Sequence, residues 1–272
     1  MSTTDYTHLI GGALKPREDF RWPLLAAAVP VGDLPGRAFC TLSSPQHQAN
    51  ASSCLPHAMA GALESESKAR VGAAVQVNRM DLYFGARWLE GNGAETRDNG
   101  SFPDKAAEWL RSYGTVGEVL KRYNPAEVKT WRPPAAWADD RRLLTADIQP
   151  MQRSVDQIRA EVAADRPVVV CHHVYQQMTD EARTTGIERG SYSPANSLGG
   201  HARCVVGYDD TAGMFLIWNW WKGWGIAHPE AATDTRFAAF RDSFSWAPYA
   251  MVVDQNWSFF LQRIARGLQV EV

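Results

Sequence analysis

The pattern of apolar residues changes halfway along the chain, and this change limits the possible folds more than any other feature. In the first half, the stretches 54–71, 79–91 and 103–114 carry apolar residues at helical spacing. One more amphipathic helix is expected at 154–165. Runs of β-branched and aromatic residues separated by Gly and Asp then predict strands at 166–175, 201–210, 213–221 and 247–254. The sequence therefore predicts an α+β fold with helices and strands largely segregated.

The length of the chain is typical of one large domain or of two lobes that share a groove. It has 272 residues, and residues 131–140 hold a proline-bearing stretch that is expected to cross between lobes. We expect an irregular N-terminal arm over residues 1–43, a helical lobe over 44–137 and a β-rich lobe over 138–272.

Composition excludes several classes of partner. The net charge is −2, and no basic block interleaved with aromatic residues is present, so nucleic acid is not expected as a partner. No apolar run reaches 18 residues and the N-terminus does not read as a secretory signal, so we expect no membrane association and a cytoplasmic location by default. Export by a specialised secretion machine stays open.

The four cysteines are widely spaced and form no C-x-x-C pair, which argues against a disulfide framework and against a zinc ribbon. The run Cys171-His172-His173 does not supply three clustered ligands, because successive side chains of a strand point to opposite faces. Neither a metal nor an organic cofactor is expected.

One of these cysteines lies where a nucleophile is commonly built. Cys54 begins the first predicted helix, with Ser52 or Ser53 as a candidate N-cap and Pro56 in the first turn. The free N–H groups and the dipole of a helix N-terminus favour an anionic sulfur. A histidine that accepts the thiol proton would complete the activation.

The chain also contains a glutamine, a histidine and an asparagine in the order in which one family of cysteine enzymes has them. It resembles the papain-like cysteine peptidases (peptidase C1) from about Leu34 to beyond Asn219, and it is most similar to bacterial-type members without a long propeptide. Four matching segments occur in the family's order: Gln48 six residues before Cys54, the glycine-rich segment 98–103, the strand 199–208 with His201, and the tryptophan-rich segment 217–225 with Asn219.

The resemblance implies a two-lobe papain-like fold, with a helical lobe, an antiparallel β-barrel-like lobe and the active site between them. It implies a catalytic triad in which Cys54 attacks a carbonyl carbon, His201 moves the proton and Asn219 orients the imidazole. Gln48 and the backbone N–H of Cys54 would form an oxyanion hole. Trp221 would cover the hydrogen bond between His201 and Asn219.

The resemblance also implies residues that contact an extended peptide. Asn99, Gly100 and Ser101 lie in the glycine-rich segment, whose backbone binds substrate in the family. Gly200 precedes the histidine, and the strand with Cys171 and His173 corresponds to one that lines a specificity pocket. These residues are expected to bind substrate.

Some positions depart from the family pattern. The usual C-G-S-C-W around the nucleophile is here the segment 51–55, which reads Ala-Ser-Ser-Cys-Leu, and the segment after Asn219 is one residue shorter. About 50 residues precede Cys54, too few for a separate pro-domain, so control by a pro-domain is not expected.

The predicted function is hydrolysis of peptide or isopeptide bonds in a peptide or protein substrate through an acyl-enzyme. Two alternatives remain at this point: a papain-like deamidase or acyl transferase that acts on a protein partner, and a non-catalytic papain-like binding protein.

Overall fold

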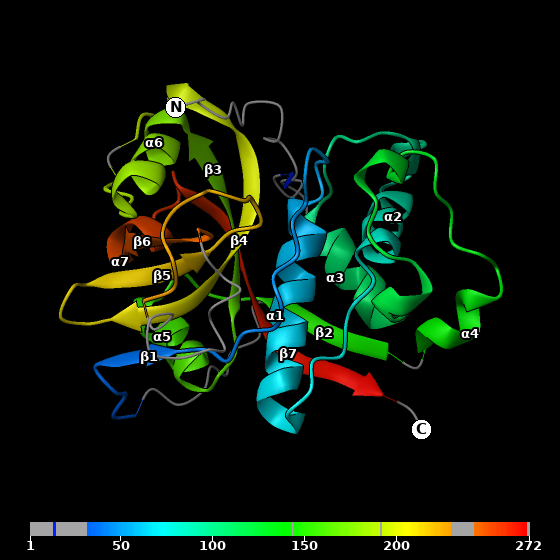
Figure 1. The fold of residues 1–272 in the computed structure, drawn as a ribbon, viewed down its shortest axis with the longest axis horizontal. Helices are drawn as coiled ribbons and strands as arrows, with labels where there is room; N and C mark the ends of the chain where they lie inside the picture. The colour runs from blue at the N-terminus through cyan, green and yellow to red at the C-terminus, as the bar shows by residue number, and fades with distance from the viewer. Residues whose placement is uncertain (1–12, 15–31, 143, 191, 230–241, 271–272) are drawn as a thin grey trace.

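A computed structural model describes residues 13–14, 32–142, 144–190, 192–229 and 242–270. A group of helices lies beside a large sheet, with one long helix between them (Figure 1). The helices on this side are α1 (Cys54–Val71), α2 (Arg79–Glu90), α3 (Pro103–Ser112) and α4 (Trp137–Arg142), with short 3-10 turns at Ala94–Thr96, Glu118–Leu120 and Pro125–Glu127.

The sheet is antiparallel and mostly formed by the second half of the chain. Its strands are β1 (Arg37–Phe39), β2 (Leu144–Pro150), β3 (Val168–Tyr175), β4 (Ser197–Asp209), β5 (Met214–Trp218), β6 (Phe244–Pro248) and β7 (Ser258–Val270). The strand order is β2-β7-β3-β4-β5-β6, and β1 pairs with β4. The helices α5 (Val155–Ala163), α6 (Gln176–Thr185) and α7 (Tyr249–Val253) and the 3-10 turn Pro194–Asn196 accompany it.

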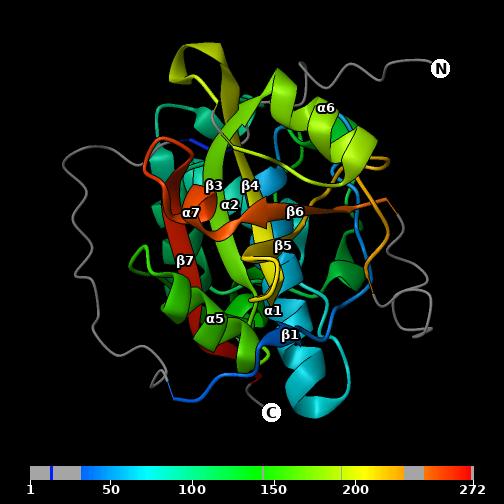
Figure 2. The same cartoon turned by 90° about the vertical axis from the view of Figure 1, so that its left-hand side faces the viewer.

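Helix α1 is the element that joins the two parts. It packs on β3, β4 and β7 and also on α2 and α3, while α5 and α6 cover the opposite face of the sheet (Figure 2). Every residue from Cys54 to Ser67 is buried. A helix buried all round is held in place by packing on all sides, so the position of its first residue is well defined.

Most predicted elements are confirmed, and one is wrong. The helix expected at 79–91 ends at Gly91, which has a positive φ of 78°, and α5 begins after Ser154, whose hydroxyl accepts from the Gln157 backbone N–H. The strand expected at 247–254 is wrong, because β6 ends at Pro248 and α7 follows directly. Pro248 has no N–H for the sheet and stands at the N-cap of α7, which ends the strand there.

Several elements lie outside the predicted set. β2, α6 and the long strand β7 were not expected, and β1 lies within the arm that was expected to be irregular. β2 pairs with β7 and also packs on α3, so these two strands extend beneath the helical part of the molecule.

The contact between α1 and the segment after β5 depends on Gly61. A Cβ at Gly61 would lie 2.5 Å from Cη2 of Trp220 and 3.3 Å from Cζ3 of Trp218, which are both buried. We expect Gly61→Ala to lower the free energy of unfolding by about 1 kcal/mol or more, because overpacking outweighs the gain in helix propensity. Urea unfolding measures this, with Gly36→Ala as the control, since nothing lies within 4 Å of a Cβ there. An unchanged midpoint for Gly61→Ala would contradict the tight contact.

Candidate active site

Cys54 occupies the first position of α1 and is fully buried. Ser53, at the N-cap, makes no side-chain capping bond, so the first turn of the helix keeps N–H groups for the sulfur. Burial raises the pKa of the Cys54 thiol to about 12, while hydrogen bonds with the backbone of Ala202, Leu55 and Cys54 itself oppose the rise. The thiol is therefore neutral in this closed arrangement.

Gln48 lies in the turn that leads into α1. Its Nε2 donates to the carbonyl of Ala51 at 2.9 Å, and its backbone N–H donates to the carbonyl of Trp220 at 3.2 Å. Ala49, the next residue, has a positive φ of 52°. One Nε2 hydrogen is thus used to fix the amide, and the second is left to donate to a bound group.

His201 is held by two neighbours from the segment after β5. Its Nε2 lies 2.8 Å from Oδ1 of Asn219, and its ring stacks on Trp221 with a centroid distance of 4.1 Å and an interplanar angle of 16°. The Asn219 oxygen also accepts from the backbone N–H of Trp220 at 2.7 Å, and the Asn219 backbone N–H donates to Ser243. The structure therefore brings together His201, Asn219 and Trp221, the three residues that the resemblance to the papain-like peptidases groups.

The other ring nitrogen of His201, Nδ1, has no hydrogen-bond partner among the residues that the structure describes. Since Nε2 engages an oxygen acceptor, the tautomer with hydrogen on Nε2 leaves a lone pair on Nδ1. The pKa of His201 is lowered to about 3: burial is the main cause, the bond to Asn219 opposes it, and the nearby Arg203 charge adds to it.

The thiol and the imidazole lie on neighbouring pieces of structure. Cys54 contacts the backbone of Ala202, and Ala202 directly follows His201 in β4. Cys54 and His201 both have an exposed fraction of 0%. Cys54 is therefore in contact with the backbone of the residue that follows His201, and both side chains lie in a region closed to solvent.

The described part of the N-terminal arm lies between two segments that were expected to bind substrate. The Leu14 backbone N–H donates to the carbonyl of Ser101 at 3.0 Å, with Ala13 and Ser101 forming a parallel bridge. On the other side, the carbonyl oxygen of Ala13 would lie 2.0 Å from a Cβ at Gly200. Ala13–Leu14 thus spans from the glycine-rich segment to the residue before His201, near the start of α1 (Figure 1). The arm therefore reaches the site, although no chemistry was expected in it.

The glycine-rich segment is tied to the nucleophile turn by Asp98. Its Oδ1 accepts from the backbone N–H of Ser52 at 2.9 Å and from the hydroxyl of Tyr83 at 2.7 Å. Gly100 has a positive φ of 88° and donates its N–H to that hydroxyl. Asn99 is exposed. These bonds hold the segment from Asp98 to Ser101 next to Cys54.

The residues expected on the pocket-lining strand, Cys171 and His173, are two positions apart in β3 and so lie on one face of the strand. Cys171 is buried opposite Ala202, and burial together with the nearby Cys54 and Cys204 raises the pKa of its thiol. His173 is partly buried, and its Nδ1 lies 3.1 Å from Oγ of Ser197. Contact of Cys171 or His173 with substrate stays a prediction.

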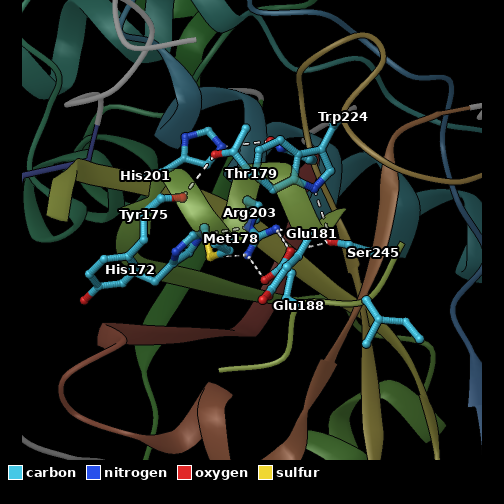
Figure 3. A network of polar contacts seen from close by, with 12 residues as sticks. His172, Tyr175, Met178, Thr179, Glu181, Glu188, His201, Arg203, Trp224 and Ser245 are labelled. Carbon is cyan, nitrogen blue, oxygen red and sulfur yellow. Dashed lines mark hydrogen bonds and ion pairs between the residues drawn. The ribbon is translucent and has the colours of Figure 1, made fainter. Parts of the chain in front are cut away.

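The side chain between them, His172, belongs to a buried polar network that the sequence did not reveal (Figure 3). Arg203 donates from Nε to Nε2 of His172 at 2.7 Å and forms a two-pronged ion pair with Glu188 at 2.5 and 2.8 Å. Both charged side chains are 0% exposed. Ser245 donates to Glu188 and accepts from Nε1 of Trp224.

Two aromatic rings of this network, His172 and Trp224, contact His201 and the ring that stacks on it. The rings of His172 and His201 meet edge to face at 5.8 Å, and Trp224 lies edge to face with Trp221, the ring that stacks on His201. A charged residue two positions after His201 in an apolar strand was the one available sequence signal. This signal did not identify the partner of Arg203, because Glu188 lies in a loop.

Membrane-spanning helices and metal-binding clusters are absent from the described residues, which do line a cavity. No helix there is long and apolar enough to cross a bilayer. No cluster of three His, Cys, Asp or Glu side chains that could hold a metal occurs among the described residues, and the four cysteines are free. A cavity of about 520 Å³ opens near the turn before Gln48, with His47, Glu118 and Tyr123 in its walls.

Several solved structures of cysteine proteases have a similar fold. Xylellain, a cysteine protease from Xylella fastidiosa, superposes with a TM-score of 0.76 at 19% identity and 97% coverage of both chains. A procathepsin B from Trypanosoma congolense gives a TM-score of 0.68 at 15% identity, covering 97% of this chain and 88% of its own. A procathepsin L 3 from the larval midgut of Tenebrio molitor gives 0.64 at 14% identity, covering 95% and 78%. The papain-like fold is therefore shown.

Sequence comparison gives the family. A peptidase C1-like protein of Acanthamoeba polyphaga mimivirus, described as uncharacterized, is 23% identical over 220 residues, which are 77% of this chain and 65% of that protein. The chain thus spans about two thirds of the length of this relative. The model of the peptidase C39-like family matches residues 44–250, which include Gln48, Cys54, His201 and Asn219. The chain belongs to the peptidase C39-like family and has the papain-like fold.

Proposed function

We propose that this protein is a cysteine peptidase in which Cys54, His201 and Asn219 hydrolyse peptide bonds through an acyl-enzyme. One observation carries the proposal above all. The imidazole of His201 is fixed through Nε2 by Asn219 and leaves Nδ1 without a partner among the described residues, while Cys54 contacts the backbone of the residue next to it.

The proposed reaction has two halves. In the first, Nδ1 of His201 takes the thiol proton, the Cys54 sulfur forms a bond to the carbonyl carbon, and the C–N bond breaks as His201 returns the proton to the leaving amine. In the second, His201 takes a proton from water, whose oxygen attacks the thioester, and the proton passes to the departing sulfur. The enzyme is restored and the substrate has gained one water.

The negative oxygen formed in each half needs donors. In this proposal they are the free Nε2 hydrogen of Gln48 and the backbone N–H of Cys54 at the helix N-terminus. Asn219 and the stacked Trp221 hold the imidazole in one orientation and keep water from the bond between His201 and Asn219.

The substrate class follows from the same geometry. A chain that lay where Ala13–Leu14 now lies would meet the Ser101 carbonyl on one side and the Gly200 backbone on the other. Backbone groups of this kind recognise an extended main chain. We therefore propose a peptide or unfolded protein segment as substrate, and the Ala13–Leu14 segment must move before it binds.

Replacement of the thiol tests the proposal directly. We expect Cys54→Ala to abolish cleavage of a panel of dipeptidyl aminomethylcoumarins and of denatured casein, because no other group would form the acyl bond. Mass spectrometry of casein products distinguishes chain cleavage from deamidation, which adds about one dalton, and from transfer, which joins two molecules. Cys40→Ala is the matched control, since Cys40 is also buried and free. Equal cleavage by Cys54→Ala and wild type would contradict the mechanism.

Gln48→Ala tests the oxyanion hole. We expect kcat to fall about 100- to 1,000-fold with a small change in KM, because the lost donor acts mainly on the transition state. Steady-state kinetics on the best coumarin substrate provide the measurement. A loss confined to KM would show instead that Gln48 only binds substrate.

We propose that Ala13–Leu14 limits the access of water to the thiol, which predicts a pH effect. Ala13 has an exposed fraction of 2%, so Ala13→Gln should displace the segment. Water then reaches Cys54, and its pKa falls from about 12 toward the range of an accessible thiol. At pH 7 we expect alkylation of Cys54 by iodoacetamide to accelerate at least about tenfold, because each pKa unit changes the thiolate fraction tenfold.

The control for this experiment is Gly36→Ala, which lies outside the Ala13–Leu14 contact. Peptide mapping identifies the alkylated cysteine. Identical rate–pH curves for Ala13→Gln and wild type would mean that this segment does not limit access to the thiol.

A further inference from the structure

Tyr123 is hydrogen-bonded to Gln48 and to Ser53, the residue before Cys54, and so connects the two residues of the proposed oxyanion hole. Its hydroxyl donates to the backbone carbonyl of Gln48 at 2.8 Å and lies 2.6 Å from Oγ of Ser53. Since the phenolic hydrogen is used on Gln48, the Ser53 hydroxyl is the donor to the tyrosine oxygen. Ser53 directly precedes Cys54, so one phenol oxygen is bonded to both ends of the turn that supplies the oxyanion donors.

The aromatic ring contacts the same turn in a third way. It lies edge to face with the ring of His57, with centroids 4.5 Å apart and an interplanar angle of 89°. Nδ1 of His57 lies 2.8 Å from the carbonyl oxygen of Ser53. Burial raises the pKa of the Tyr123 hydroxyl, so it stays protonated and keeps its hydrogen for the Gln48 carbonyl.

The backbone of Tyr123 is anchored to buried charges. Its N–H donates to Oε1 of Glu118 at 2.7 Å, and Oε2 of Glu118 accepts from the backbone N–H of Arg79 at 3.0 Å. The Arg79 guanidinium makes two hydrogen bonds of 2.9 Å to Glu64, which lies in α1. Arg79, Glu64 and Glu118 have side chains that are 1%, 3% and 7% exposed.

These contacts form a continuous chain of hydrogen bonds and ion pairs that begins in α1 and returns to its N-terminus. It runs from Glu64 through Arg79 and Glu118 to Tyr123, and then to Ser53 at the start of the same helix. Buried ion pairs with several hydrogen bonds have few alternative arrangements, because breaking one leaves an uncompensated charge. The phenol is therefore held by the rigid part of the helical lobe.

We propose that Tyr123 is a positioning residue that sets the separation and direction of the two oxyanion donors, Gln48 Nε2 and the Cys54 backbone N–H. This inference rests on the proposed function of Cys54. The Gln48 carbonyl has one other described bond, from the Ala51 N–H at a long 3.4 Å, so the phenol is its main restraint. Without the hydroxyl, the turn relaxes and the donors lose alignment with the developing charge.

The test compares two reactions of one sulfur in Tyr123→Phe. Hydrolysis of a dipeptidyl aminomethylcoumarin passes through an oxyanion, whereas alkylation by iodoacetamide does not. Both require access to Cys54, so the ratio of their rates reports on the oxyanion hole alone. We expect kcat to fall about tenfold with KM changed less than about twofold, since a small misalignment costs less than a lost donor. The alkylation rate should stay at the wild-type value.

Two further variants sharpen the result. Tyr113→Phe removes a phenol hydroxyl from a partly exposed ring at the end of α3 and should leave both rates unchanged. Ser53→Ala removes the other partner of the Tyr123 oxygen. If both act through one junction, adding Ser53→Ala to Tyr123→Phe should cost less than Ser53→Ala costs alone.

The outcomes separate the inference from the function on which it rests. Wild-type kcat in Tyr123→Phe would overturn the inference while leaving the peptidase intact. An equal fall in hydrolysis and alkylation, with a lower melting temperature, would also overturn it, because the role would then be structural. If wild type and Cys54→Ala behave alike, the proposed function fails, and the role of Tyr123 fails with it.

Discussion

The burial of α1 on all sides is the constraint on which the candidate site depends. A thiol at the tip of an exposed helix would move with the fraying of its first turn, but here the residues from Cys54 to Ser67 have no solvent to move into. The sheet supports the helix on one side, and α2 and α3 support it on the other. His201 lies in β4 of that same sheet and Asn219 directly follows β5, so the packing of one helix on the sheet sets where the sulfur lies relative to these residues.

Charges inside the protein reinforce this arrangement from two directions. On the helical side, Arg79 is paired with Glu64 and Glu118; on the sheet side, Arg203 is paired with Glu188 and bonded to His172. Each pair lies next to a part of the candidate site, and neither contributes an atom to the proposed chemistry. Buried pairs of this kind specify one arrangement of their surroundings more than they add stability.

The sequence was informative where chemistry and local pattern coincide. The helix that starts at Cys54 and the strand that holds His201 could be placed from periodicity, while the roles of Gln48 and His201 came from the resemblance to the papain-like peptidases. The run 247–254 misled because a short apolar stretch fits a strand or a helix equally well, and Pro248 decided between them.

The supporting residues could not be predicted, since their roles depend on contacts between distant parts of the chain. Tyr123 reaches Gln48 across 75 positions, and Arg203 meets Glu188, which a sequence pattern does not distinguish from an ordinary surface carboxylate. The contact of Ala13 with Gly200 is of the same kind. Such pairings emerge only when the chain is folded.

The complete enclosure of Arg203 and Glu188 has a consequence for the solution behaviour of the protein. Dissolved ions screen the interactions of charges that face water, with a Debye length of about 8 Å at physiological ionic strength. They cannot enter the space between two side chains that have no exposed surface. The electric field that this pair exerts on the His201 ring is thus almost independent of ionic strength. Dissolved ions therefore act mainly on the charges of this protein that water reaches.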